Sequence, residues 1–403
     1  MSKPARRTRG RLRAGATIKD VARHAGVSPM TVSRVVNDSE YVSNTTRNAV
    51  QRAVRELGYS PNLAARNLAS ERGERMGLLY GNPSSAYLSE FLVGALEAAT
   101  RHGVQLVLEK CEPTPVASRR AVRRLLSGAV VGVVLPPPLC ESSIVRAELN
   151  AARLPIVTVA AGLPPADTMC VRIDDYTAAL EMTRFLLSLG HERLAFIKGH
   201  PNQSASDERW RGFRAALEEA GRGPRGERPP PRMEQGFFSF RSGLDAARKL
   251  LAADPAPTAI FASNDDMAAA VIAEAHRRGL DVPRDLTVVG FDDTLIASTI
   301  WPELTTIQQP IARMAAEAID MLVAAVRGSV AELTKAPGAL ADGDSRSGGK
   351  GAGTKPGNRR APTQEAQAGG PAAREGLERL HRLIPHALIS RESAAAPKLA
   401  ART

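Results

Sequence analysis

The chain has 403 residues, with 54 Lys or Arg against 42 Asp or Glu, which gives a formal net charge of +12. This length allows two or three domains with sizeable apolar cores. The basic excess is concentrated at the N-terminus, because residues 1–75 hold fifteen Lys or Arg but only six Asp or Glu. A basic N-terminal part on a nearly neutral remainder indicates a nucleic-acid partner for that part alone.

Cysteine usage and hydropathy exclude several classes of protein. Cys111, Cys140 and Cys170 stand singly, which disfavours a disulfide framework or a zinc site and fits a reducing cytosol. No apolar run approaches the roughly 20 residues of a membrane span, and no hydrophobic signal core follows the basic start. We therefore expect a cytoplasmic protein that has no membrane partner, no metal and no cofactor.

Residues 1–16 contain six Lys or Arg and no acidic residue. Such a composition predicts a disordered basic arm, which either adds contacts to phosphate groups or is a solvated tail.

Residues 17–59 have the pattern of a helix-turn-helix. Apolar or small residues recur at helical spacing, and Gly26 lets the chain turn sharply between two short helices. Thr17 and Asp20 form a capping-box pattern at the first helix, and Ser28 stands before a proline as a typical start of the second. The pattern predicts a DNA-binding domain.

The second helix of this domain is expected to read DNA. With Val32 and Val35 buried, its remaining side chains face outward, and Arg34 is able to donate two hydrogen bonds to a guanine. Contact of Arg34 with phosphate alone is the other interpretation. The candidate DNA-binding residues of the domain are Thr17, Ser28, Pro29, Met30, Thr31, Ser33, Arg34 and Asn37.

Residues 60–74 form a linker that contains a short helical pattern, LAARNLAS. A helix of this length is unstable in water when it stands alone, so we expect it to depend on a partner.

From residue 75 to residue 328, short apolar runs alternate with amphipathic segments. Continuous apolar strands separated by helices predict parallel sheets covered on both faces, and the series restarts near Val171. The predicted fold class is therefore α/β, with two successive lobes and a cleft between them. The predicted strands are 76–80, 104–109, 130–135, 155–160, 171–173, 193–199, 258–263 and 286–291, and the main predicted helices are 88–102, 116–127, 175–189, 209–220, 242–252, 265–278 and 311–327.

Residues 329–376 are rich in Gly, Ala, Pro and Ser and predict a flexible, low-complexity insertion. Its GGKGAGT stretch lacks the spacing and the preceding strand of a phosphate loop, so nucleotide binding is disfavoured. Residues 377–403 contain RLIPHALISRES, which is expected to return as a strand to one of the lobes.

Several motifs together resemble the lactose/galactose-repressor (LacI/GalR) family of bacterial transcription regulators. They are VSPMTVSRVVN, VSNTTR, ELGYSPNLAARNLAS, SNDDMA and VVGFDDT. The resemblance covers nearly the whole chain except the arm and the insertion. It implies a homodimer, a hinge helix, and a core like that of a periplasmic sugar-binding protein. The heptad helix that makes some members tetramers is absent, which favours a dimer.

The resemblance also implies roles for particular residues. Positions matching Pro29, Met30 and Arg34 read bases in the family, but Pro and Met have no side-chain donor and can contact only groups such as a thymine methyl. The hinge helix, with Asn62, Ala65 and Leu68 as candidate DNA contacts, is implied to fold on DNA. Leu68 would then enter the minor groove as an apolar wedge, the other interpretation being that it packs against the core.

For the core, the resemblance implies a small effector, usually a sugar or nucleobase, bound between the lobes. The matching positions are Tyr87, Leu88, Arg209, Phe238, Asn264 and Asp292. Asp, Asn and Arg satisfy vicinal hydroxyl groups, and aromatic rings cover the C–H face of a sugar. The other interpretation makes Arg209 a solvated charge, Asp292 the cap of a turn, and the apolar members part of the core.

The favoured function is thus an effector-responsive transcription factor of the repressor type that binds a pseudo-palindromic DNA operator. The predicted DNA-binding domain argues against the alternative that the chain is the solute-binding protein of a transporter. An enzyme is disfavoured because no Gly-x-Ser-x-Gly, His-Glu-x-x-His or phosphate-loop motif is present. An architectural DNA-binding protein would have no use for a two-lobe body of this size.

Overall fold

The computed structural model describes residues 17–36, 43–57, 74–112, 114–165, 168–221, 231–335 and 380–398. The chain divides into two compact units, Met1–Gly73 and Glu74–Thr403, which are described separately. Within the described ranges, no helix combines the length and the apolar character that a bilayer crossing requires. The predicted arm, the predicted hinge helix, and the candidates Asn37, Asn62, Ala65 and Leu68 lie outside these ranges.

The first unit contains three helices around a small apolar core. They are α1 (Ile18–Ala25), α2 (Pro29–Val36) and α3 (Asn44–Glu56). Small and β-branched residues let the three helices approach closely. The core consists of Val21, Ala22, Val32, Val35, Val50 and Ala53.

The predicted helix starts of this unit are confirmed. The Thr17 hydroxyl accepts a hydrogen bond from the Asp20 amide at 3.3 Å, and the Asp20 carboxylate accepts from the Thr17 amide at 2.9 Å. The Ser28 hydroxyl accepts from the backbone amide of Thr31 at 3.1 Å. Gly26 has φ 66°, a left-handed conformation that ends α1 and that a side chain would strain.

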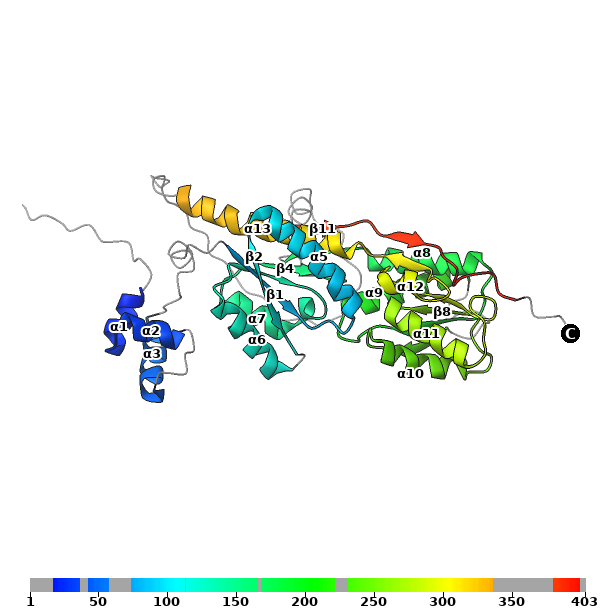
Figure 1. Ribbon diagram of the computed structural model, residues 1–403, viewed down its shortest axis with the longest axis horizontal. Coiled ribbons are helices and arrows are strands. Elements are labelled where there is room, and N and C mark those ends of the chain that lie inside the picture. The colour runs from blue at the N-terminus through cyan, green and yellow to red at the C-terminus, as the bar shows by residue number, and fades with distance from the viewer. Residues whose placement is uncertain are drawn as a thin grey trace, which may run out of the picture. The chain divides into compact units, whose positions relative to one another are not determined.

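The second unit contains two parallel sheets, each covered by helices on both faces, and the predicted α/β fold class is confirmed (Figure 1). The first sheet, in lobe 1, has the order β11-β5-β4-β3-β1-β2. Helices α5 and α13 pack together on one face, while Leu125 of α6 lies against Gly77 on the other. Its strands are β1 (Arg75–Tyr80), β2 (Gln105–Lys110), β3 (Gly132–Leu135), β4 (Ile156–Val159), β5 (Met169–Arg172) and β11 (His381–Leu383), and its helices are α5 (Ser85–His102), α6 (Pro115–Ser127), α7 (Ser143–Ala151) and α13 (Ile311–Lys335), with a single turn η1 (Leu139–Glu141).

The second sheet, in lobe 2, has the order β7-β6-β8-β9. Side chains alternate between the two faces of β6, so Phe196 packs with the core beneath α8 and α9, whereas Ile197 packs with the core beneath α10 and α11. The strands are β6 (Leu194–Lys198), β7 (Arg232–Gln235), β8 (Ala259–Ala262) and β9 (Thr287–Val289), and the helices are α8 (Asp175–Ser188), α9 (Ser204–Glu219), α10 (Phe240–Leu251), α11 (Asp265–Arg277) and α12 (Leu295–Thr299).

Within the described residues the chain passes between the lobes three times. It leaves lobe 1 between β5 and α8, and it returns between β10 (Thr306–Gln308) and α13. It passes again between β11, which pairs with β5, and β12 (Ala387–Ile389), which pairs with β10. These three connections bring the ends of the two sheets together.

The C-terminal part differs from the prediction in two respects. Helix α13 continues to Lys335 rather than ending at residue 327, so residues 329–335, assigned to the insertion from sequence, are helical. The predicted single C-terminal strand is two short strands, β11 and β12. Pro385 lies between them and has no backbone N–H for a sheet hydrogen bond. Residues 336–376 of the predicted insertion are outside the described ranges.

Candidate functional site

A pocket lies where the carboxyl ends of the strands in both lobes meet. Ligands of open parallel sheets bind at this position, because the loops that follow the strands converge there. The space within it that atoms do not fill is about 410 Å³, counting the part open to solvent. The residues that line it are Asn82, Ser84, Tyr87, Pro137, Ala160, Gln203, Ala205, Arg209, Phe238, Asn264, Asp292 and Gln309.

Many of these residues lie in the segments that follow strands. Ser84 comes after β1, Ala160 after β4, Phe238 after β7, Asn264 after β8 and Asp292 after β9. The remaining members include Tyr87, which lies in the first turn of α5, and Arg209, which lies in the second turn of α9. The topology thus places polar groups from distant parts of the sequence around one pocket.

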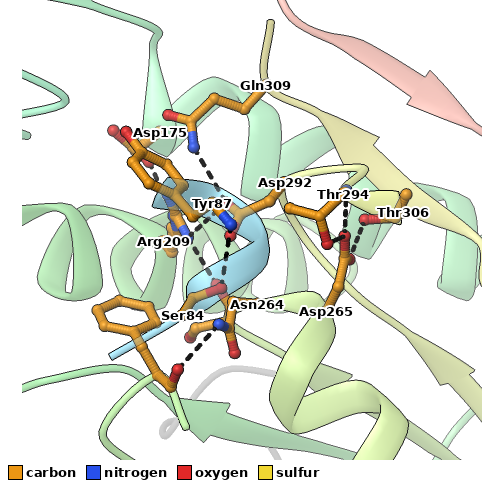
Figure 2. A network of polar contacts seen from close by, with 12 residues as sticks. Ser84, Tyr87, Asp175, Arg209, Asn264, Asp265, Asp292, Thr294, Thr306 and Gln309 are labelled. Atoms are coloured by element: carbon orange, nitrogen blue, oxygen red, sulfur yellow. Dashed lines mark hydrogen bonds and ion pairs between the residues drawn. The ribbon is translucent and has the colours of Figure 1, made fainter. Parts of the chain in front are cut away.

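Arg209 is the centre of the polar network (Figure 2). Its Nε donates to the Asp175 carboxylate at 2.8 Å, and one terminal nitrogen donates to the Ser263 carbonyl at 2.6 Å. The same nitrogen lies 3.8 Å from the Asp292 carboxylate, and the guanidinium carbon lies 3.6 Å from the centroid of the Phe291 ring. Charge, hydrogen bonds and ring stacking therefore fix the guanidinium in one orientation.

The carboxyl groups around Arg209 are shielded from water. Burial raises the pKa of Asp292 well above its ordinary value, and Arg209 opposes this shift while the neighbouring Asp265 adds to it. Burial likewise raises the pKa of Asp175, again against the effect of Arg209. The Gln309 amide nitrogen donates to Asp292 at 3.0 Å. The buried Arg209 cation therefore lies beside two buried carboxyl groups, of which that of Asp292 lines the pocket.

Three residues that line the pocket have strained backbones. Ala160, Phe238 and Asp292 have φ values of 54°, 57° and 112°, which are unfavourable for residues with a side chain. Such strain persists only where the surrounding contacts impose it, and it is frequent at ligand-binding sites.

Two polar contacts join the lobes beside the pocket. The Ser84 hydroxyl of lobe 1 donates to the Asp266 carboxylate of lobe 2 at 2.6 Å. The Glu141 carboxylate of lobe 1 accepts from the amide and the hydroxyl of Ser204, both at 2.8 Å. Helix α9 has no side-chain cap from its own N-cap residue, so Glu141 caps it from the opposite lobe.

Five of the six effector candidates from sequence line this pocket: Tyr87, Arg209, Phe238, Asn264 and Asp292. Leu88 does not, because it lies one helical position beyond Tyr87, about 100° around α5, and is half-buried there. Sequence reasoning missed Ser84, Gln309 and the Arg209 partner Asp175, among others. The one available signal was that polar residues stand directly after buried strands.

In the helix-turn-helix unit, the candidate DNA-binding side chains lie on the surface. Thr17, Ser28, Pro29, Met30 and Arg34 are exposed, and Thr31 is half-buried with its hydroxyl 2.9 Å from that of Ser28. Arg34 has no hydrogen-bond or ion-pair partner among the described residues. The Ser33 side chain is outside the described set.

A three-helix DNA-binding unit joined to a two-lobe core with a pocket between its sheets defines a ligand-responsive DNA-binding regulator. Comparison with known proteins agrees with this class. The sequence pattern of the lacI family of bacterial regulatory proteins matches residues 17–62, and that of the periplasmic binding protein-like domain matches residues 183–345.

Among full-length relatives, the HTH-type transcriptional regulator DegA of Bacillus subtilis is 36% identical over 303 residues, which are 75% of this chain and 88% of DegA. The ribose operon repressor of Escherichia coli is 34% identical over 76% of this chain and 92% of its own. Among solved structures, the CelR–cellobiose complex aligns with a TM-score of 0.63 at 28% identity, over 94% of this chain and all of that one. The lac repressor dimer bound to operator aligns with a TM-score of 0.61 at 25% identity, over 95% and 100% of the respective chains.

The chain therefore belongs to the lacI family of bacterial regulatory proteins. It is a DNA-binding transcriptional repressor of the kind that responds to a small-molecule effector, and its relatives are regulators rather than enzymes.

Proposed function

We propose that the chain lowers transcription by binding a pseudo-palindromic operator as a cytoplasmic homodimer, and that a sugar or sugar derivative held between the lobes controls its operator affinity. The pocket carries this proposal. It combines the buried polar groups of Arg209, Asn264 and Asp292 with the ring of Phe238. Vicinal hydroxyl groups both donate and accept hydrogen bonds, and a ring packs against the C–H face of a sugar. The related CelR is known as a complex with cellobiose.

The DNA-binding side of the proposal rests on the exposed face of α2. Arg34 would donate to a guanine edge, while the neighbouring hydroxyl groups contact phosphates or base edges. The lac repressor, a structural relative, is known as a dimer on its operator. A dimer has two such helix-turn-helix units, and each unit contacts one half-site of the DNA. The two half-sites together form a pseudo-palindromic operator.

Ligand control would act through the lobes. An effector that has different affinities for two arrangements of the lobes shifts the populations of those arrangements. The operator affinity changes if the spacing of the two DNA-binding units in the dimer differs between the arrangements. The proposal includes the hinge segment outside the described residues, where Asn62, Ala65 and Leu68 would contact the minor groove. The short sequence of that helix supports a folding step that depends on DNA.

A thermal-shift screen of sugars tests the effector class. We expect at least one neutral monosaccharide or disaccharide to raise the melting temperature of the full chain, since a ligand that binds only the folded state stabilises it. Asp292→Ala should abolish that shift when each protein is compared with its own unliganded form.

The control variant for this screen is Asp245→Ala, which removes an exposed carboxylate on α10 and should leave the shift unchanged. If nucleobases or amino acids raised the melting temperature and no sugar did, the sugar assignment would be wrong.

Operator binding tests the hinge. We expect Leu68→Ala to keep the unfolding profile of the wild type but to weaken operator binding by on the order of tenfold, because a wedge that unstacks base pairs stabilises the bent complex. Gel-shift titration and a DNA-bending assay measure both effects. Unchanged affinity and bending would show that Leu68 is not a wedge.

A further inference from the structure

The charge of Arg209 is already matched inside the protein. Among the residues that line the pocket, Arg209 is the one with a positively charged side chain. Its guanidinium is bonded to Asp175 at 2.8 Å and lies 3.8 Å from Asp292, and all three side chains are buried. Since an arginine stays protonated in proteins and its 2.8 Å contact is a charge-assisted pair, the cation is neutralised before any ligand arrives.

Further negative charge lies at the edge of the pocket. Asp266 accepts a hydrogen bond from Ser84, one of the lining residues. If either Asp175 or Asp292 were protonated, the site would lose one negative charge. The carboxylate of the other residue would still balance the charge of Arg209. The pocket therefore offers no surplus positive charge to an anion.

The buried polar atoms that lack a hydrogen-bond partner also favour an uncharged ligand over an anion. The Gln309 side-chain carbonyl and the second carboxylate oxygen of Asp175 are buried and have no donor. Of these two residues, Gln309 lines the pocket and Asp175 does not. The Gln309 carbonyl needs a donor, which a hydroxyl group supplies and an ionised phosphate group does not. The Tyr87 hydroxyl is also buried without a partner and suits a second hydroxyl group.

Arg209 is also unable to turn toward a phosphate without losing its present contacts. Its bond to the Ser263 carbonyl and its stacking on Phe291 hold the guanidinium plane. A phosphate group would have to break the pair with Asp175 or lie against the carboxylates, and like charges repel each other strongly in a buried site.

We propose that this pocket selects an uncharged, hydroxyl-bearing effector over the phosphate ester of the same compound, and that Asp175 and Asp292 set this selectivity. The inference rests on the proposed function of the pocket as the effector site. Asp175 acts by neutralising Arg209 and does not line the pocket itself.

Calorimetric titration of the full chain with matched pairs tests the selectivity. The pairs are D-ribose with ribose 5-phosphate, D-glucose with glucose 6-phosphate, D-fructose with fructose 1-phosphate, and inosine with inosine 5′-monophosphate. For any pair that binds, we expect the ester to bind at least about tenfold more weakly than the neutral compound. The variants Asp175→Asn and Asp292→Asn keep their hydrogen bonds but remove the charge of an ionised carboxyl group, so at least one of them should reduce that preference by about tenfold.

Asp174→Asn is the matched control. Asp174 caps α8 one residue before Asp175, but its carboxylate bonds to Thr177 and not to Arg209. An asparagine caps a helix equally well, so this variant should keep the wild-type preference to within about twofold. A melting curve of each variant without ligand shows whether it has folded.

The outcomes separate the selectivity from the function on which it rests. An ester that binds as tightly as its neutral partner, or an unchanged preference in both folded Asn variants, overturns the selectivity and leaves the pocket as an effector site. Binding of inosine but of no sugar overturns the sugar class, while the inosine pair still tests the charge selection. If no compound of any pair binds, both the proposed function and the selectivity are contradicted.

Discussion

Arg209 shows how a buried charge is held in this protein. An isolated guanidinium in the interior would lose its hydration, and the structure replaces the water with the Asp175 carboxylate, the Ser263 carbonyl and the Phe291 ring. The sequence supports Arg209 as a pocket residue only by resemblance. The sequence does not indicate that Asp175 is the ion-pair partner of Arg209, because 33 residues separate the two.

Asp265 is a second residue whose environment changes its chemistry. It is buried, and its carboxylate accepts hydrogen bonds from the amide and hydroxyl of Thr294 and from the hydroxyl of Thr306 (Figure 2). Burial raises its pKa to about 7, and these hydrogen bonds oppose the shift. Between about pH 4 and pH 7 the folded state thus holds a proton that the unfolded state releases.

A proton bound only in the folded state makes stability fall as pH rises through that range. We expect Asp265→Asn to remove this contribution, because the amide can accept from Thr294 and donate to Thr306. The loss of unfolding free energy between pH 4 and pH 8 should therefore be smaller than in the wild type by about 4 kcal/mol, as measured by urea unfolding. If Asp265→Asn kept the pH dependence of the wild type, Asp265 would not be its source.

At the scale of elements, close helix packing rests on glycine. Helices α5 and α13 lie side by side in lobe 1 (Figure 1), and a Cβ at Gly94 of α5 would lie 1.9 Å from the Ala312 carbonyl of α13. This distance is far below van der Waals contact, and the obstacle is backbone. The two helices can approach each other closely only because residue 94 has no side chain.

We expect Gly94→Ala to destabilise the chain by about 3 kcal/mol or more, since the helices must separate to admit a methyl group. Gly328→Ala is the matched control in α13, where nothing lies within 4 Å of the added Cβ. Alanine is the better helix former, so this change should be neutral or stabilise by up to about 1 kcal/mol. Urea unfolding distinguishes the two, and equal effects would show that the Gly94 contact is not tight.

The helical elements agree with their sequence signals more closely than the strands do. Capping residues mark the start of α1, α2 and α8 within one or two residues of the prediction. Strands β7 and β10 were not predicted from the sequence, because their residues RMEQ and TIQ lack an apolar run. Strand β7 lies at the edge of its sheet, and β10 is held by pairing with β12, so both are determined by tertiary contacts.

At the scale of the whole molecule, Glu141 couples the two lobes. It caps α9, the helix that carries Arg209, yet it does not line the pocket. Loss of this contact would make the observed arrangement of the lobes less favourable without removing a group that could touch a ligand.

We therefore expect Glu141→Ala to weaken binding of any effector that favours this arrangement by about tenfold, which corresponds to the loss of about 1.4 kcal/mol of interlobe contact. Calorimetry with a sugar that binds the wild type measures the change. Glu148→Ala removes a carboxylate that pairs with Arg119 inside lobe 1 and should have no effect. Equal affinities of Glu141→Ala and wild type would mean that the contact does not influence binding.

The sequence by itself determined the α/β class, the helix-turn-helix, the two-lobe order of the chain and five of the residues around the pocket. Those features depend on local signals, namely apolar periodicity, capping residues and short motifs, or on resemblance to a family. They require no knowledge of which distant segments meet.

Only the tertiary structure decided the pairing of Arg209 with Asp175, the contact of Ser84 with Asp266, and the capping of α9 by Glu141. Each of these contacts joins residues that lie far apart in the sequence. No local sequence pattern around one residue predicts its partner. The physical reason is that burial and proximity, which set charge compensation and pKa values, arise only when the strand ends of both lobes converge.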